Sequence, residues 1–164
     1  MSDLIVLAYT DESNAEAAYR EVQKLQNGLI VELAGLALVK VDPDGKTRVE
    51  TPDGGQIVGY STASGALFGA VIGLLFFVPL IGLVVGGALG ALFSALERTG
   101  MNARFRAQVK DVVAAGSSAV VIYATKITRD KFAEALAPFG GTVVETSLSS
   151  DEEKELAHSL EPAR

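Results

Sequence analysis

The chain has 164 residues, of which 49% are hydrophobic and 21% are charged, and its formal net charge is −6. This length suits one ordinary domain, and the acidic balance argues against a nucleic-acid-binding protein. The chain has no cysteine and a single histidine, His158, which excludes disulfides, thiolate chemistry and cysteine-based or histidine-rich metal sites within one chain. The first residues, Met1 to Tyr9, lack a basic region, so they predict a strand rather than a signal peptide and a start in the cytoplasm.

The N-terminal part predicts a strand, a helix and a hairpin. Leu4 to Tyr9 form a continuous apolar run of strand length, which is typical of a strand buried on both faces. Ser13 and Glu16 have capping-box spacing and predict the start of a helix, which Gly28 ends. A second strand is predicted over 36–41.

The next segment predicts the return of the chain along the sheet edge. Asp42-Pro43-Asp44-Gly45 is a turn signal, and the polar residues 46–51 predict an edge strand paired with the preceding one.

An uncharged block then dominates the sequence. No charged side chain occurs from Gly54 to Leu96, and residues 65–93 are all Gly, Ala, Leu, Phe, Val, Ile or Pro. Because about 20 apolar residues cross a bilayer once, this block is long for one span and short for two. We expect residues 61–96 to form a hairpin of two short helices, inserted into a locally thinned bilayer or re-entrant.

Small residues recur every fourth position on both sides of a central point in this block. A fold near Phe77 brings each small residue of one arm level with a small residue of the other, so the two backbones can pack closely. The residues predicted to pack the arms are Ser61, Gly65, Gly69, Gly73, Gly82, Gly86, Gly90 and Ser94. The predicted tip is Phe76, Phe77, Val78 and Pro79, where the proline removes a backbone donor. Leu75 and Leu83 are expected on the outer surface of the hairpin.

Basic residues follow the block and predict which side of the membrane its ends occupy. They are Arg98, Arg104, Arg106 and Lys110. Basic flanks favour the cytoplasmic side. Glu97 and Asp111 dilute this signal, and an ordinary solvated helix face is the alternative.

The C-terminal part predicts a second set of alternating elements. Asn102 is expected to cap a helix that buries Phe105 and Val109. A second fully apolar strand follows over 119–124, then a helix over 128–137, as predicted by their hydrophobic patterns. Residues 142–147 alternate as a strand, and Ser150 with Glu153 predict the start of a charged terminal helix.

The two halves resemble each other weakly, since Val6 to Thr10 and Val121 to Thr125 are similar and each precedes a helix. Interleaving them predicts an α+β, ferredoxin-like split βαβ sheet, with the strands in the order 142–147, 4–9, 119–124, 36–41 and 46–51. The domain would comprise residues 1–53 and 99–149 together, with 61–96 as an inserted glycine-zipper transmembrane or re-entrant hairpin and 150–164 as a C-terminal helix or tail. Both ends of the insert would then return to the same side of a membrane.

Several stretches resemble a bacterial family catalogued as domain of unknown function 1269, whose members are predicted to be membrane proteins. The most specific stretches are Gly73 to Gly82 and Pro138 to Leu148, the latter preceded by Gly116-Ser-Ser-Ala-Val. The resemblance extends from about Leu4 to Leu160, and one departure is Ala114-Ala115-Gly116, where a proline is expected before the glycine. It implies a membrane location and no known reaction.

The sequence offers little chemistry. Asp11 and Glu12 follow the first strand without a base or metal partner, and Asp42 with Asp44 lack the other ligands of a calcium loop. The acidic run 151–155 has no histidine ligand near it and suits a solvated helix. We therefore expect no catalytic residue, no metal site and no cofactor, and we predict that the protein is not an enzyme.

The sequence thus predicts a membrane-associated, self-assembling interaction or structural protein. Its expected partners are membrane lipid and further copies of itself, with no nucleic acid. Its expected location is the bacterial cytoplasmic (inner) membrane, with the soluble domain on the cytoplasmic side. Two alternatives stay open: a soluble homo-oligomer that sequesters its hairpins, with or without lipid, in its interior, and a pore made by a ring of hairpins, which the lack of a polar row disfavours.

Overall fold

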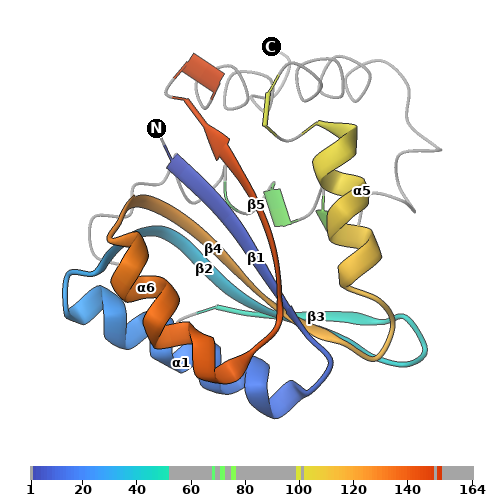
Figure 1. Ribbon diagram of the computed structural model, residues 1–164. Coiled ribbons are helices and arrows are strands. Elements are labelled where there is room, and N and C mark those ends of the chain that lie inside the picture. Colours follow the sequence, from blue (N-terminus) through green and yellow to red (C-terminus); the bar gives the residue numbers. More distant parts are fainter. Residues whose placement is uncertain are drawn as a thin grey trace.

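The computed structural model describes residues 2–51, 68, 71–72, 75–76, 99–100, 102–149 and 151–152. Over these residues the chain is a mixed α+β protein with one five-stranded antiparallel sheet, ordered β3-β2-β4-β1-β5 (Figure 1). The strands are β1 (Ser2–Tyr9), β2 (Val31–Val41), β3 (Thr47–Glu50), β4 (Ser118–Ile127) and β5 (Thr142–Leu148). The helices are α1 (Glu12–Asn27), α5 (Ala103–Val112) and α6 (Arg129–Leu136), the last followed by a 3-10 turn, Ala137–Phe139.

The strand order is the one that interleaving two β-α-β halves predicts. One half is β1-α1-β2 and the other is β4-α6-β5. The two similar segments lie side by side, because Val6 of β1 is opposite Val121 of β4. These two strands occupy inner positions, which explains their fully apolar sequences, and the polar β3 lies at the edge as expected.

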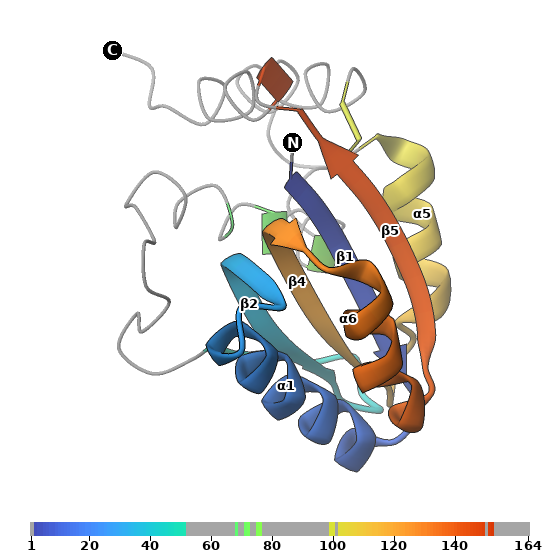
Figure 2. The ribbon, with the colours of Figure 1, turned by 60° about the vertical axis from the view of Figure 1, so that its left-hand side comes forward.

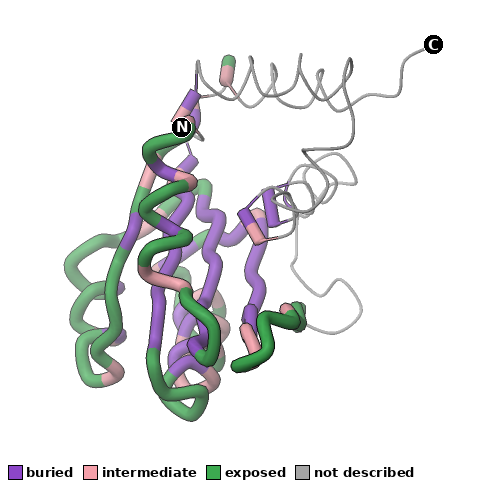
Figure 3. The backbone as a smooth tube through the Cα atoms, turned by 90° about the vertical axis from the view of Figure 1, so that its right-hand side faces the viewer, coloured by how far each residue is buried: buried purple, intermediate pink, exposed green. Residues whose placement is uncertain are grey.

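The sheet is the middle of three layers, because both of its faces are covered (Figures 2 and 3). On one face, which we call the α1/α6 face, the two helices α1 and α6 pack on the strands. The opposite face, the α5 face, carries α5 and part of the apolar block. Side chains of β1 alternate between them, with Leu4 and Val6 on the α5 face and Ile5 and Leu7 on the α1/α6 face.

Several element boundaries differ from the sequence prediction, as at Ile127, where β4 ends three residues after the predicted end. Helix α1 begins at Glu12, because Asp11 and not Ser13 is its N-cap and accepts a hydrogen bond of 2.8 Å from the Ser13 N–H. The capping box at the end of β5 lies one residue earlier than expected, on Ser149 and Glu152, which bond each other's backbone N–H groups. Strand β2 begins at Val31, five residues before the predicted start.

Helix α1 ends at the predicted residue, but the left-handed backbone conformation falls on the residue after it. Gly28 ends the helix as predicted, with an ordinary φ of −87°. The following residue, Leu29, instead adopts φ 62°, and the Ile30 N–H bonds the Leu25 carbonyl at 2.9 Å. This is the Schellman arrangement with leucine in the left-handed position that glycine usually occupies.

Most of the predicted hairpin lies outside the described residues. Within 61–96 the structure describes Phe68, Val71, Ile72, Leu75 and Phe76. Among the described residues, no helix combines the length and the apolar character needed to cross a bilayer.

Candidate functional site

The α5 face of the sheet holds the one described contact between the domain and the apolar block. Phe68, Val71, Ile72 and Leu75 are helical and between 2% and 7% exposed. Their spacing of three, four and seven residues places them on one side of a helix. They belong to the same buried cluster as side chains of β1, β2, β4, β5 and α5, which include Leu4, Val39, Val121, Val144 and Phe105.

Gly35 of β2 makes room for the largest of these four side chains. A Cβ atom at Gly35 would overlap the ring of Phe68. The ladder between β2 and β4 is irregular between Glu32 and Gly35, and an irregularity of this kind bends a strand. On the neighbouring strand, the Tyr123 ring stacks on Phe68 with centroids 6.4 Å apart and an interplanar angle of 6°. The aromatic ring therefore covers a glycine that would otherwise leave a gap in the sheet surface.

The structure corrects the placement of Leu75 and shows the surroundings of Phe76. Leu75, which the hairpin interpretation places on the outer surface, is only 2% exposed and is part of the core. Phe76, a predicted tip residue, is half-buried and lines a hollow of about 270 Å³ with Val41, Gly45 and Val109. The sequence could not show which side of the helix Leu75 occupies, because its neighbours are also apolar. Without polar residues on the opposite side, the segment has no amphipathic pattern.

The predicted packing residues lie outside the described part of the chain. They are Ser61, Gly65, Gly69, Gly73, Gly82, Gly86, Gly90 and Ser94. The remaining tip residues Phe77, Val78 and Pro79, and the flanking Arg98, also lie outside it.

The other three flanking cations are on α5, whose predicted cap is confirmed. Asn102 accepts a hydrogen bond of 3.1 Å from the Phe105 N–H. Arg104 and Lys110 are exposed and Arg106 is partly buried. At 3.6 residues per turn, Arg104 lies on one side of the buried Phe105 and Val109, whereas Arg106 and Lys110 lie on the other. The three cations therefore do not form one continuous basic stripe.

The acidic residues near the start of α1 are engaged by a lysine that the sequence analysis missed. The Lys40 side chain on β2 is 11% exposed, and its Nζ lies 3.0 Å from Glu12, 2.9 Å from Glu16 and 3.3 Å from Glu50. The hydrogen bonds that Lys40 donates to Glu16 and Glu12 raise the pKa of Lys40, and the hydrogen bond and charge of Lys40 lower the pKa of Glu16. These ion pairs link α1 to β2 and β3, so Glu12 has a structural role.

The other acidic candidates also have structural roles in the described residues. Asp42 begins the predicted turn, with its N–H bonded to the Lys46 carbonyl, and its carboxylate pairs with Arg48 at 3.0 Å. Gly45 in the same turn has φ 90°, which favours glycine. The described residues contain no group of three or more His, Cys, Asp or Glu side chains able to hold a metal ion.

Taken together, these features define an α+β sheet protein onto which one side of an apolar helical segment is packed. A family model described as "Protein of unknown function (DUF1269)" matches residues 62–161, which is more than half of the chain, and the chain belongs to this family. The match contains the three stretches on which the resemblance rested, but it starts well after Leu4, so β1, α1, β2 and β3 precede it. No curated protein and no solved structure matches the chain.

Proposed function

We propose that this protein is a membrane-associated, self-assembling interaction protein. In this proposal the apolar block contacts lipid, and the sheet domain lies on the cytoplasmic side of a bacterial inner membrane. The observation that carries the proposal is that the described part of the block packs on the sheet through one side of a helical segment. Phe68, Val71, Ile72 and Leu75 pack on the α5 face, and α1 and α6 already cover the opposite face.

For the remaining apolar residues of the block, which lie outside the described residues, we expect another partner. Residues 65–93 contain no polar side chain, and a contiguous apolar surface of that size is rare on a soluble monomer. Lipid supplies such a partner, and so do further copies of the chain. We expect one chain to use both, with lipid on the outer sides of the helices and self-association between neighbouring blocks.

The glycine series fits this arrangement because it is expected on a side of the segment that faces neither the sheet nor the lipid. At about 100° per residue, Gly69 and Gly73 are expected well away from the direction in which Phe68 and Leu75 meet the sheet. The glycines then stay available for a second arm, as the hairpin hypothesis requires. A non-catalytic role is part of the proposal, since Lys40 holds Glu12 and Glu16 and Asp11 caps α1.

Membrane flotation after an alkaline carbonate wash tests the proposal. The wild-type chain should float with membranes. In the double variant Val85→Asp/Leu89→Asp, the membrane–water partition coefficient should fall more than a thousandfold. The reason is that each aspartate at the centre of a span costs about 2.5–3.5 kcal/mol. The matched control, Val85→Ala/Leu89→Ala, should still float. If the wild-type chain stays in solution without detergent, membrane association is contradicted and the soluble homo-oligomer is favoured.

Cysteine crosslinking tests the packing of the arms and the self-assembly. Cysteines at Gly69 and Gly86 should crosslink within one chain, more efficiently than cysteines at Gly69 and Gly90. Crosslinks between chains alone would mean that the glycine series joins different copies rather than two arms.

A further inference from the structure

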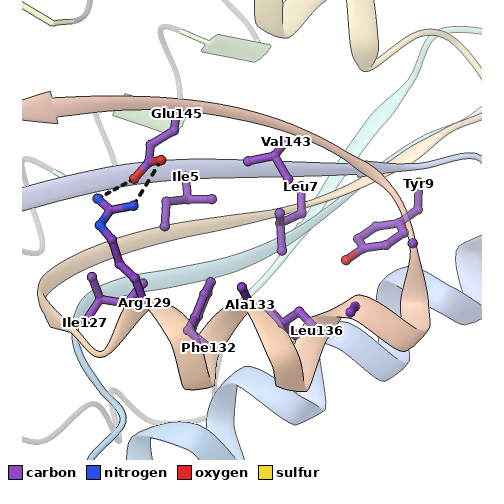
Figure 4. Close-up of a pocket in the computed structure, with 12 residues that line it drawn as sticks. Ile5, Leu7, Tyr9, Ile127, Arg129, Phe132, Ala133, Leu136, Val143 and Glu145 are labelled. Carbon is purple, nitrogen blue, oxygen red and sulfur yellow. Dashed lines mark hydrogen bonds and ion pairs between the residues drawn. The ribbon is translucent and has the colours of Figure 1, made fainter.

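A second apolar recess lies on the α1/α6 face, on the opposite side of the sheet from the apolar block. It is a groove of about 270 Å³ between α6 and the strands β1 and β5 (Figure 4). Its floor is formed by Ile5 and Leu7, one wall by Phe132 and Leu136 of α6, and its open side by Val143, which is 60% exposed. The groove is therefore a largely apolar site that is open to the surface along the β5 edge.

A buried hydroxyl group without a hydrogen-bond partner among the described residues belongs to a side chain that lines this groove. Tyr9 lines the groove and is only 3% exposed, and its hydroxyl group has no hydrogen-bond partner among the described residues. Figure 4 shows the ring of Tyr9 directed from β1 toward α6. An unpaired buried hydroxyl group costs about 1–3 kcal/mol, so such groups are rare unless something else satisfies them.

Gly141 holds the Tyr9 ring in this position. It has φ 93°, and a Cβ atom there would lie 2.6 Å from Cε1 of Tyr9. The backbone at Gly141 thus packs directly against the ring. Burial raises the pKa of Tyr9 to about 12. The hydroxyl group is therefore protonated at neutral pH and has a proton to donate.

The charges at the other end of the groove are already paired. Arg129 lies 2.8 Å from Glu145 and 3.2 Å from Asp3. One guanidinium thus faces two carboxylates, so the described residues at this end offer no free positive charge to an anionic ligand. The electrostatics favour a neutral molecule.

We propose that this groove binds a small neutral, mainly apolar molecule that accepts a hydrogen bond from Tyr9 through a carbonyl oxygen. A cavity of about 150 Å³ lined by apolar side chains holds benzene. By the same ratio, this groove has room for about eleven non-hydrogen atoms. The floor from Ile5 to Tyr9 covers four residue steps of about 3.4 Å, which suits an elongated ligand. The site is independent of the membrane proposal, since it uses the other face of the sheet.

Two probes that differ by one oxygen test this site. The ketone 4-phenylbutan-2-one is of the expected size and carries a carbonyl group, and butylbenzene replaces that group with a methylene. Each is titrated into the full chain in phosphatidylcholine nanodiscs, with methyl NMR signals of Ile5 and Leu136 as the readout. Val109, on the α5 face, is the reference that should not move.

The Tyr9→Phe variant separates the hydrogen bond from the apolar contact. It should weaken binding of the ketone roughly fivefold, the equivalent of one neutral hydrogen bond, and leave butylbenzene binding unchanged. Partitioning of a probe into the lipid is the same for both variants and cancels in their ratio. A loss of equal size for both probes would overturn the role of the hydroxyl group.

The Ala133→Leu variant tests whether the groove itself is the site. Ala133 is an exposed residue of α6 that lines the groove, so leucine there fills the space without disturbing the core. Both probes should lose binding to this variant. Binding that survives Ala133→Leu, or the absence of any shift at Ile5 and Leu136 with either probe at millimolar concentration, would overturn the proposal and leave a groove that holds only water.

Discussion

The contact between Gly35 and Phe68 leads to a specific prediction about how the apolar block packs on the sheet. In the Gly35→Ala variant the new methyl group would overlap the Phe68 ring. The ring is 5% exposed and stacked on Tyr123, so it cannot swing aside freely. We expect the free energy of unfolding to fall by about 1–3 kcal/mol, the usual range for overpacking.

The same substitution should have the opposite sign once the ring is removed. In a Phe68→Ala background, itself about 3–5 kcal/mol less stable, Gly35→Ala should stabilise the chain by about 0.5–1 kcal/mol, because glycine is unfavourable inside a strand. The difference between the two backgrounds is the coupling energy of the pair. The assay is urea unfolding of the full chain, followed by circular dichroism.

The matched control is Gly28→Ala, since Gly28 has an ordinary φ and its added Cβ would meet nothing closer than 3.7 Å. It should be neutral or slightly stabilising in both backgrounds. An equal cost for Gly35→Ala with and without the Phe68 ring would refute the packing of the block on the sheet.

Three further predictions follow from the described residues. Leu29→Gly should stabilise the chain by about 0.5–1 kcal/mol by relieving the positive φ of an 88% exposed leucine, and Leu29→Ala should bring no such gain in the same unfolding assay. Tyr9→Phe should raise the free energy of unfolding of the ligand-free chain by about 1 kcal/mol, because it removes an unpaired hydroxyl group; a clear loss of stability would show that the group has a partner. Lys40→Met should flatten the fall in stability on acidification between about pH 5 and 3, measured by urea unfolding at each pH. Because Lys40 lowers the pKa of Glu16, the stability from this pair is present above the usual pKa of glutamate and is lost as the pH falls; unchanged acid sensitivity in Lys40→Met would contradict this.

The arrangement of the sheet was predictable because its signals are local. Apolar runs of strand length marked β1 and β4 as inner strands, and the similarity of Val6 to Thr10 and Val121 to Thr125 indicated two interleaved halves. The start of β2 was missed because Glu32 and Gly35 interrupt its apolar pattern, and the irregular ladder at this point shows why they are tolerated.

The buried side of the apolar block, the Lys40 cluster and the Tyr9 hydroxyl group were not predicted from the sequence, and the physical reason differs for each. In the apolar block the side that packs on the sheet has no polar contrast around it, so Leu75 was assigned to the outer surface although it is buried. The Lys40 cluster joins residues far apart in the chain, which spacing alone does not reveal. Tyr9 ends an ordinary apolar run, and only the packed structure shows that its hydroxyl group has no partner among the residues that the structure describes.

The central claim, that the apolar block contacts lipid, is tested most directly with a single tryptophan. The chain contains none, so Leu89→Trp introduces one fluorophore into the block, and Val49→Trp places one on the edge strand β3, where Val49 is 37% exposed. In vesicles, brominated lipid should quench Leu89→Trp and aqueous iodide should not, whereas Val49→Trp should show the reverse. Protection of Leu89→Trp from both quenchers would contradict the account and place the block inside a protein assembly.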